Sequence, residues 1–268
     1  MFSGRYMIAS GTRQELVANY KRLGGEPPAW AWKYKPSVPF IGDAYRPVDG
    51  LLIYASAENL AWMNRKDVPA RFEDERVWDR YRAVYDEAGR TGSSFFPDVG
   101  IQPVTDGGLF AAGLFVARKL RVATGDRPRE FLETLAVTNW CKFSVKAENN
   151  ADYVADTEKL AASLPYVVAE LVVLKPKVTL LPKAVWQQSL LQAAMRGASP
   201  CTHFVPVPQF NTTVVNCHLD SFTENGLRLR RELAGSVLAE WMRNLYGFHE
   251  EHAWRYLAFL DEALRGFQ

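Results

Sequence analysis

The sequence predicts a three-layer α/β/α sandwich around a central, mainly parallel sheet of four strands. Four short runs are apolar throughout instead of alternating with polar residues, as strands that are buried on both faces do. Helical patterns separate these runs, and alternating strands and helices are typical of right-handed βαβ crossovers. The chain has 268 residues, which is enough for a single domain with a large core.

The four predicted strands are each bounded by turn residues or by helical patterns. In chain order they cover residues 50–54, 135–140, 178–181 and 202–207. The third run lies between Pro176 and Pro182, which restrict how far it can extend.

Helical patterns fill the intervals and the end of the chain. The predicted helices cover residues 72–88, 109–120, 152–174 and 184–195, followed by a last helix that carries Ala253, Leu257, Leu260 and Leu264. Pro165 should kink the third helix or begin a new helical segment, because proline lacks a backbone N–H. An apolar residue recurs every four positions at Leu229, Leu233, Val237, Trp241 and Leu245, as in a core-facing helical stripe.

Charge and cysteine content narrow the class of protein. The 32 Lys and Arg against 30 Asp and Glu give a net charge of +2, which argues against a protein that holds nucleic acid by bulk charge. Cys141, Cys201 and Cys217 are an odd and sparse set, which argues against a disulfide framework and favours a reducing compartment. The sequence contains neither a signal-peptide pattern nor about 18 apolar residues in a row. We therefore expect a cytoplasmic protein that does not engage a membrane.

Ligands of open α/β sheets bind beyond the carboxyl ends of the strands. Asn139 lies at the end of the second predicted strand, and its amide offers one acceptor and two donors that match the edge of uracil. The alternative is that Asn139 satisfies the backbone of the following turn. Phe95 and Phe96, in a long segment rich in Gly, Ser and Pro, offer flat faces on which a base can stack. The alternative for both is core packing.

Other candidate sites are weaker. The sequence has no Walker-type phosphate loop and no GxSxG elbow, and we expect no cofactor. His249 and His252 have a spacing compatible with a metal, but no third ligand is evident nearby, so we expect no metal. We expect Cys201 and His203 to be packed interior residues instead of a catalytic pair.

Three segments carry a resemblance to the uracil-DNA glycosylase superfamily, closest to its single-strand-selective monofunctional type. Residues 91–99 (Thr-Gly-Ser-Ser-Phe-Phe-Pro-Asp-Val) resemble the stretch that bears that family's uracil-stacking aromatic. Residues 131–141 are similar to its second strand, which ends in an Asn-aromatic-Cys step, here Asn-Trp-Cys. Residues 171–181 resemble the helix-to-strand step before its last strand, and together the similarity covers residues 48–215.

The resemblance implies a set of roles. Phe95 would stack on a flipped base and Asn139 would read its edge, while Glu58 or Asn59 would position the attacking water. Residues 206–211 would form a DNA-intercalating loop that contains Pro206, Pro208 and Phe210, with Phe210 as the wedge.

The sequence also departs from the family pattern. The family has Gly and Pro after its first strand, and residues 55–63 contain neither. Where the family carries His-Pro-Ser-Pro after its last strand, residues 205–208 read Val-Pro-Val-Pro, so Val205 stands where the histidine that stabilises the departing base is expected. His203 lies two residues earlier, on the same strand face. The resemblance therefore preserves base recognition better than catalysis.

The resemblance implies a uracil-DNA-glycosylase-like fold and a protein that binds DNA, and we expect a monomer. We expect it to hydrolyse the N-glycosidic bond of uracil or another damaged base. The first alternative is a catalytically silent nucleobase- or nucleic-acid-binding member of the same fold, and the second is an unrelated α/β enzyme that acts on a small nucleotide or sugar. Within a single domain of residues 1–268 we expect an N-terminal extension over 1–46 that packs on the core, a glycosylase-like core over 47–215 and C-terminal helices over 216–268.

Overall fold

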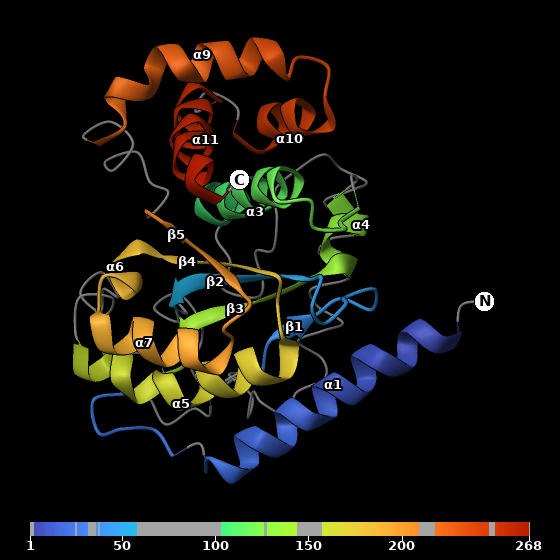
Figure 1. Cartoon of the computed structure of the whole chain (residues 1–268), viewed down its shortest axis with the longest axis vertical. Coiled ribbons are helices and arrows are strands. Elements are labelled where there is room, and N and C mark those ends of the chain that lie inside the picture. The colour runs from blue at the N-terminus through green and yellow to red at the C-terminus, as the bar shows by residue number, and fades with distance from the viewer. Residues whose placement is uncertain are drawn as a thin grey trace.

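A computed structural model describes the chain over most of its length. The described residues are 3–24, 26–31, 36, 38–57, 103–125, 128–143, 157–208, 218–246 and 250–267. Over these ranges the chain forms a mixed sheet with helices on both faces (Figure 1).

The described sheet has five strands in the order β1-β3-β2-β4-β5. They are β1 (Phe40–Ile41), β2 (Leu51–Ala57), β3 (Leu135–Cys141), β4 (Val178–Pro182) and β5 (His203–Val207). The pairs β2–β3, β2–β4 and β4–β5 are parallel, which confirms the four predicted strands and their parallel arrangement. Strand β1 pairs antiparallel with β3 and was not predicted, because two residues are too few to show a pattern.

Helices cover one sheet face from the middle and the end of the chain. They are α3 (Pro103–Lys119), α10 (Val237–Tyr246) and α11 (Glu250–Leu264), with α9 (Thr223–Glu232) packed outside α11 and α4 (Pro128–Thr134) leading into β3. Two short 3₁₀ turns, Asp220–Phe222 and Arg265–Phe267, flank this group. Gly113 lets α3 approach β2, since a Cβ there would lie 2.7 Å from the Ile53 side chain.

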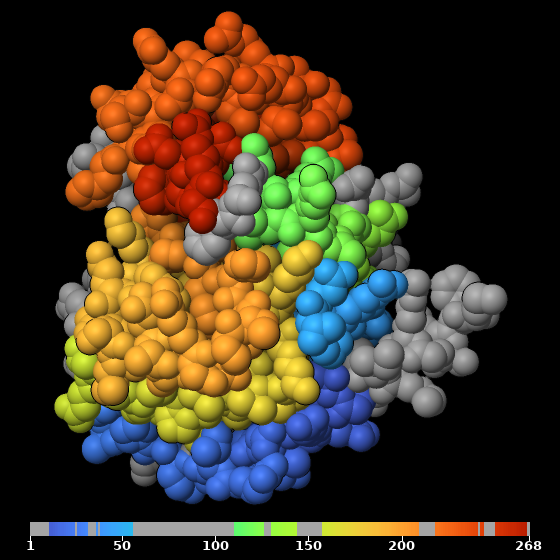
Figure 2. Space-filling view, in the orientation of Figure 1, coloured from blue at the N-terminus to red at the C-terminus, as the bar shows by residue number. Residues whose placement is uncertain are grey.

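Helices α5 (Thr157–Leu174), α6 (Lys183–Trp186) and α7 (Ser189–Ala198) cover the opposite face. Helix α1 (Ser3–Arg22) packs on the outside of α5, where Leu16 and Tyr20 are buried. Figure 2 shows α1 at one end of the molecule and the C-terminal helices at the other. Burial from both sides explains why Leu51, Leu52 and Ile53 are fully buried in succession.

Several helix boundaries differ from the predictions. Helix α5 continues through Pro165, which lies on its exposed side, where a carbonyl without its usual donor can be hydrated. Two helices, α6 and α7, replace the single one predicted for residues 184–195. The apolar stripe is also divided between α9 and α10, because Gly235 between them has a φ of 78° that ends a helical path. The helix predicted for residues 72–88 lies outside the described residues.

A glycine behind β1 provides a test of this packing. Gly42 donates its N–H to the Leu135 carbonyl at 2.9 Å, and a Cβ on it would lie 2.3 Å from the backbone of Glu133. We expect Gly42→Ala to lower the free energy of unfolding by about 1–3 kcal/mol, because backbone atoms must move apart. Urea denaturation measures this change.

The matched control is Gly197→Ala in α7, where a Cβ would meet no atom within 4 Å. Alanine has the higher helix propensity, so this change should leave stability unaltered or raise it by about 0.5–1 kcal/mol. Equal losses in the two variants would contradict the packing described for β1.

Candidate functional site

The parallel register brings the carboxyl ends of β2 and β3 together. Ala55 pairs with Asn139 and Ala57 pairs with Cys141, so the chain leaves both strands at neighbouring points of one edge. The β4 and β5 strands end in register at Pro182 and Val207, on the same edge. This is where an open α/β sheet binds its ligands.

Asn139 is the sequence-predicted site residue that the structure places most clearly. Thr138 is on the α5 side of the sheet, because Lys142 Nζ bonds both its hydroxyl and Glu170 of α5. Successive side chains of a strand point to opposite faces, so the Asn139 side chain is on the α3 side. Both Asn139 and its strand partner Ala55 are partly exposed, and the small Ala55 side chain leaves space beside the amide. Among the described residues, none forms a hydrogen bond with the Asn139 side chain. The described turn therefore does not use this amide as a backbone cap.

A buried polar network lies behind this edge, on the α5 side of the sheet. The fully buried Glu170 carboxylate of α5 accepts hydrogen bonds from Tyr20 Oη at 2.5 Å and Tyr54 Oη at 2.8 Å. Lys142 Nζ, the side chain of which is 1% exposed, lies 2.5 Å from the same carboxylate and donates to Thr138 Oγ1 at 3.0 Å. The network therefore joins α1, α5, β2 and the residue that follows β3.

The environment keeps both tyrosines of the network neutral. Burial raises the pKa of Tyr20 and of Tyr54 well above the usual value, and the nearby Glu170 carboxylate raises it further. Both hydroxyls therefore remain donors to Glu170 over the physiological pH range. The backbone N–H of Lys142 also donates to Ser163 Oγ at 2.9 Å, which fixes the end of β3 to α5. The backbone that carries Asn139 is thus held from behind.

The end of β5 is fixed by a different contact. Pro206 lies within β5, paired with Leu181, and only Pro208 belongs to the segment after the strand. Tyr256 Oη of α11 donates to the Pro208 carbonyl at 2.8 Å. Because β3 and β5 are separated by β2 and β4, Pro208 lies about 15 Å from Asn139 along the edge, given the usual strand spacing.

The remaining predicted site residues fall into two groups. Glu58, Asn59, Phe95 and Phe210 lie outside the described residues. Val205 is buried, and His203 lies at the amino end of β5, about 13 Å from its carboxyl end. Therefore His203 does not take the place of the family histidine. Cys201 and His203 are both exposed, so the prediction that they are interior residues was wrong.

The described ranges hold neither a metal-binding cluster nor a helix suited to span a membrane. There, no group of three or more His, Cys, Asp or Glu side chains is arranged to hold a metal ion. No helix among those ranges combines the length and the apolar character needed to cross a bilayer.

The fold and this edge define an α/β protein with a mixed sheet and an open polar amide at the carboxyl ends of its parallel strands. Comparisons with protein-family models, with curated protein sequences and with solved structures found no match for the chain.

The buried carboxylate is predicted to stabilise the fold strongly. We expect Glu170→Gln to lower the free energy of unfolding by about 3–5 kcal/mol, because it removes the carboxylate that forms an ion pair with the buried Lys142 ammonium. Urea denaturation at neutral pH measures the change. Glu262→Gln, an exposed carboxylate on α11, is the control and should change stability by less than about 0.5 kcal/mol. If Glu170→Gln lowered the free energy of unfolding by as little as this control does, the network would contribute little to stability.

Alkaline pH should weaken the fold through the same network. Because the pKa of Tyr20 is raised on folding, its contribution is complete below about pH 10, the value for unfolded tyrosine, and is lost as pH rises above it. Each such tyrosine adds a loss of about 1.4 kcal/mol per pH unit above that point. In urea titrations we expect Tyr20→Phe to reduce this slope by about half a proton at pH 10 and by nearly one proton at about pH 11. An unchanged slope would contradict the burial of the hydroxyl.

Proposed function

We propose that this protein binds DNA and hydrolyses the N-glycosidic bond of uracil or another damaged base. The observation that carries the proposal is the pairing of Ala55 with Asn139, which places the Asn139 amide beside the carboxyl end of β2. No described residue forms a hydrogen bond with this amide. An enzyme that reads a flipped base needs such donors and acceptors on a fixed strand end, next to the segment that supplies the water.

The proposed reaction displaces the base from its sugar. Asn139 would bind the base edge with one acceptor and two donors while the water oxygen attacks C1′ of the sugar. The C1′–N bond breaks, its electron pair leaves with the base, and the water proton ends on the base or on a neighbouring carboxylate. Glu58 or Asn59 would direct the water and Phe95 would stack on the base, as the family resemblance implies.

Rigidity behind the edge supports this assignment. Catalysis by fixed dipoles requires that recognition groups do not reorganise during the reaction. Lys142 follows the strand of Asn139 and is tied to α5 by its side chain and by its backbone. The network therefore supplies the stiff support that a base-reading amide needs.

A second candidate is a silent member that binds a nucleobase or nucleic acid without turnover. The observation that favours it is the absence of a histidine from the described part of the carboxyl edge, where Val205 is buried and His203 lies at the opposite end of β5. Loss of one charge-stabilising donor lowers turnover by about 10²–10³-fold in comparable sites. Recognition by Asn139 does not require that donor.

Base release from oligonucleotides tests the proposed function. We expect the protein to release uracil from single- or double-stranded oligonucleotides, and Asn139→Ala to slow release by about 10²-fold or more. Asn225→Ala is the matched control, since Asn225 is also partly exposed but lies on α9. It should release uracil at the wild-type rate.

The outcomes separate the two candidates. Binding to the oligonucleotides that depends on Asn139, with no release of any base, would establish the silent member. Release that Asn139→Ala leaves unchanged would place the site elsewhere. If the protein neither releases a base nor binds the oligonucleotides, both candidates are refuted.

A further inference from the structure

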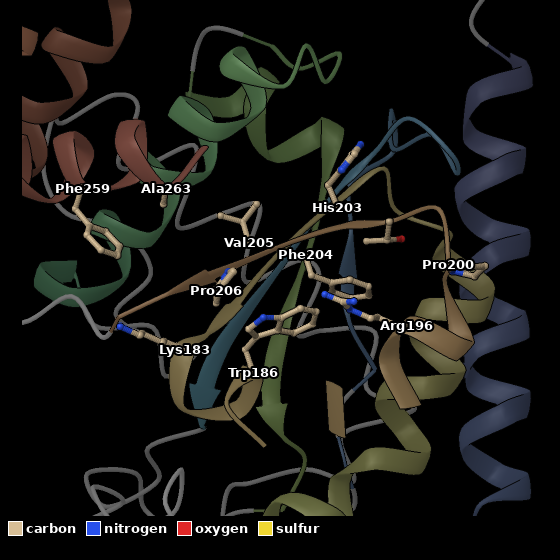
Figure 3. Close-up of a pocket in the computed structure, with 11 residues that line it drawn as sticks. Lys183, Trp186, Arg196, Pro200, His203, Phe204, Val205, Pro206, Phe259 and Ala263 are labelled. Atoms are coloured by element: carbon tan, nitrogen blue, oxygen red, sulfur yellow. The ribbon is translucent and has the colours of Figure 1, made fainter. Parts of the chain in front are cut away.

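Strand β5 is an edge of the described sheet, and a groove with a volume of about 480 Å³ follows its free side (Figure 3). We call it the β5 groove. Its lining consists of strand residues, residues of α6 and α7 and their flanks, and residues of α11: Lys183, Trp186, Arg196, Pro200, Thr202, His203, Phe204, Val205, Pro206, Phe259 and Ala263. The base site at Asn139 is three strands away, so the β5 groove is a separate feature.

The β5 groove is positively charged in a protein that is nearly neutral. Its lining includes the cations Lys183 and Arg196, the imidazole of His203 and no acidic residue. Lys183 and Arg196 are exposed, and no described carboxylate forms an ion pair with either one. An anionic ligand therefore meets cations that are not already neutralised by described residues.

The cations are spread along the strand instead of being gathered at one point. Arg196 lies near the amino end of β5, whereas Lys183 follows Pro182 at the carboxyl end (Figure 3). Five residues of extended strand place these ends about 13 Å apart. Cations placed at different points along a strand suit an extended polyanion.

Aromatic side chains lie between the cations. Trp186 is half-buried and stacks on Phe204, with ring centroids 5.2 Å apart and an interplanar angle of 26°. The Arg196 guanidinium lies 5.2 Å from the Trp186 ring, which orients its planar N–H donors before a ligand arrives. Phe259 of α11 adds a partly exposed ring on the other side. Aromatic faces interleaved with cations are what proteins use to bind single strands.

The strand edge itself is unsuited to a peptide partner. The His203 N–H points toward β4 and donates to the carbonyl of Lys177, the residue before that strand. Because successive N–H groups of a strand point to opposite sides, the backbone nitrogens of Phe204 and Pro206 point away from β4. Proline has no N–H, and an added β-strand would lack a hydrogen bond at Pro206. The edge therefore favours a ligand that is held by its charge and its rings.

We propose that the β5 groove binds a single strand of nucleic acid, with phosphates on Lys183 and Arg196 and a base against the partly exposed Phe259 ring. The choice of nucleic acid as the polyanion rests on the proposed function. In that function the β5 groove would hold the part of the nucleic-acid strand that lies outside the base site at Asn139. Sequence preference is not expected, because every base has a face that can stack.

Binding of undamaged oligothymidylate tests this proposal without requiring catalysis. The probe is fluorescein-labelled (dT)12, measured by fluorescence anisotropy over a series of salt concentrations. We expect the double variant Lys183→Glu/Arg196→Glu to weaken binding at least about tenfold. The salt dependence should also fall by about 1.4 in log–log slope, since about two phosphate contacts are lost.

The matched control is Arg228→Glu/Arg243→Glu, which makes the same change in net charge at exposed positions outside the groove. It should bind (dT)12 within about twofold of the wild type. Equal weakening in both double variants, or none in Lys183→Glu/Arg196→Glu, would overturn the proposal. Equally tight binding of polyglutamate would also overturn it, because the groove would then be a general anion site. Circular dichroism confirms that each variant is folded.

The uracil-release assay on the same proteins separates this proposal from the proposed function. If the wild type releases no base and Lys183→Glu/Arg196→Glu loses (dT)12 binding, the groove proposal is supported and the glycosylase proposal is refuted. Release of uracil by the wild type, with unchanged (dT)12 binding by Lys183→Glu/Arg196→Glu, supports the enzyme and refutes the groove.

Discussion

The Glu170 carboxylate is fully buried, where the Lys142 ammonium balances its charge and the hydroxyls of Tyr20 and Tyr54 donate hydrogen bonds to it. A buried carboxylate is tolerated only when ion pairing and hydrogen bonds offset its lost hydration. These partners come from α1, β2 and the end of β3, so the position of each element depends on the same carboxylate. The placement of α1, β2 and the end of β3 against α5 therefore depends on one electrostatic constraint.

This constraint gives the two faces of β3 different roles. On the α5 side, Thr138 and Lys142 belong to the buried network, and Trp140 is fully buried against Tyr54. On the other side, Asn139 keeps an amide to which no described residue forms a hydrogen bond. Alternation along one strand thus connects a rigid interior to a polar group that can meet a ligand. The β5 groove lies at the far edge of the same sheet, where no further described strand covers it.

The sequence predicted the parallel strands because unbroken apolar runs reflect burial on both faces, as at Leu51 to Tyr54. It also predicted that Asn139 lies at a strand end. The break at Gly235 was missed, because the apolar spacing continues across it while the backbone does not. A signal for Glu170 existed, since it is a lone acid within an apolar helical segment, but its partners are 28 to 150 residues away in the chain. Such long-range partners, like the stacking of Trp186 on Phe204, depend on the crossovers between strands.

If Asn139 binds a nucleobase at the carboxyl edge, as proposed, its side-chain amide reports the binding directly. Nitrogen-15 spectra recorded during titration with uracil, and then with a uracil-containing oligonucleotide, follow the NH₂ signals of Asn139, assigned from their absence in Asn139→Asp. We expect saturable shifts of this pair, while the Asn225 pair on α9 stays in place. Binding that shifts other signals and leaves the Asn139 pair unchanged would contradict the proposed role of Asn139.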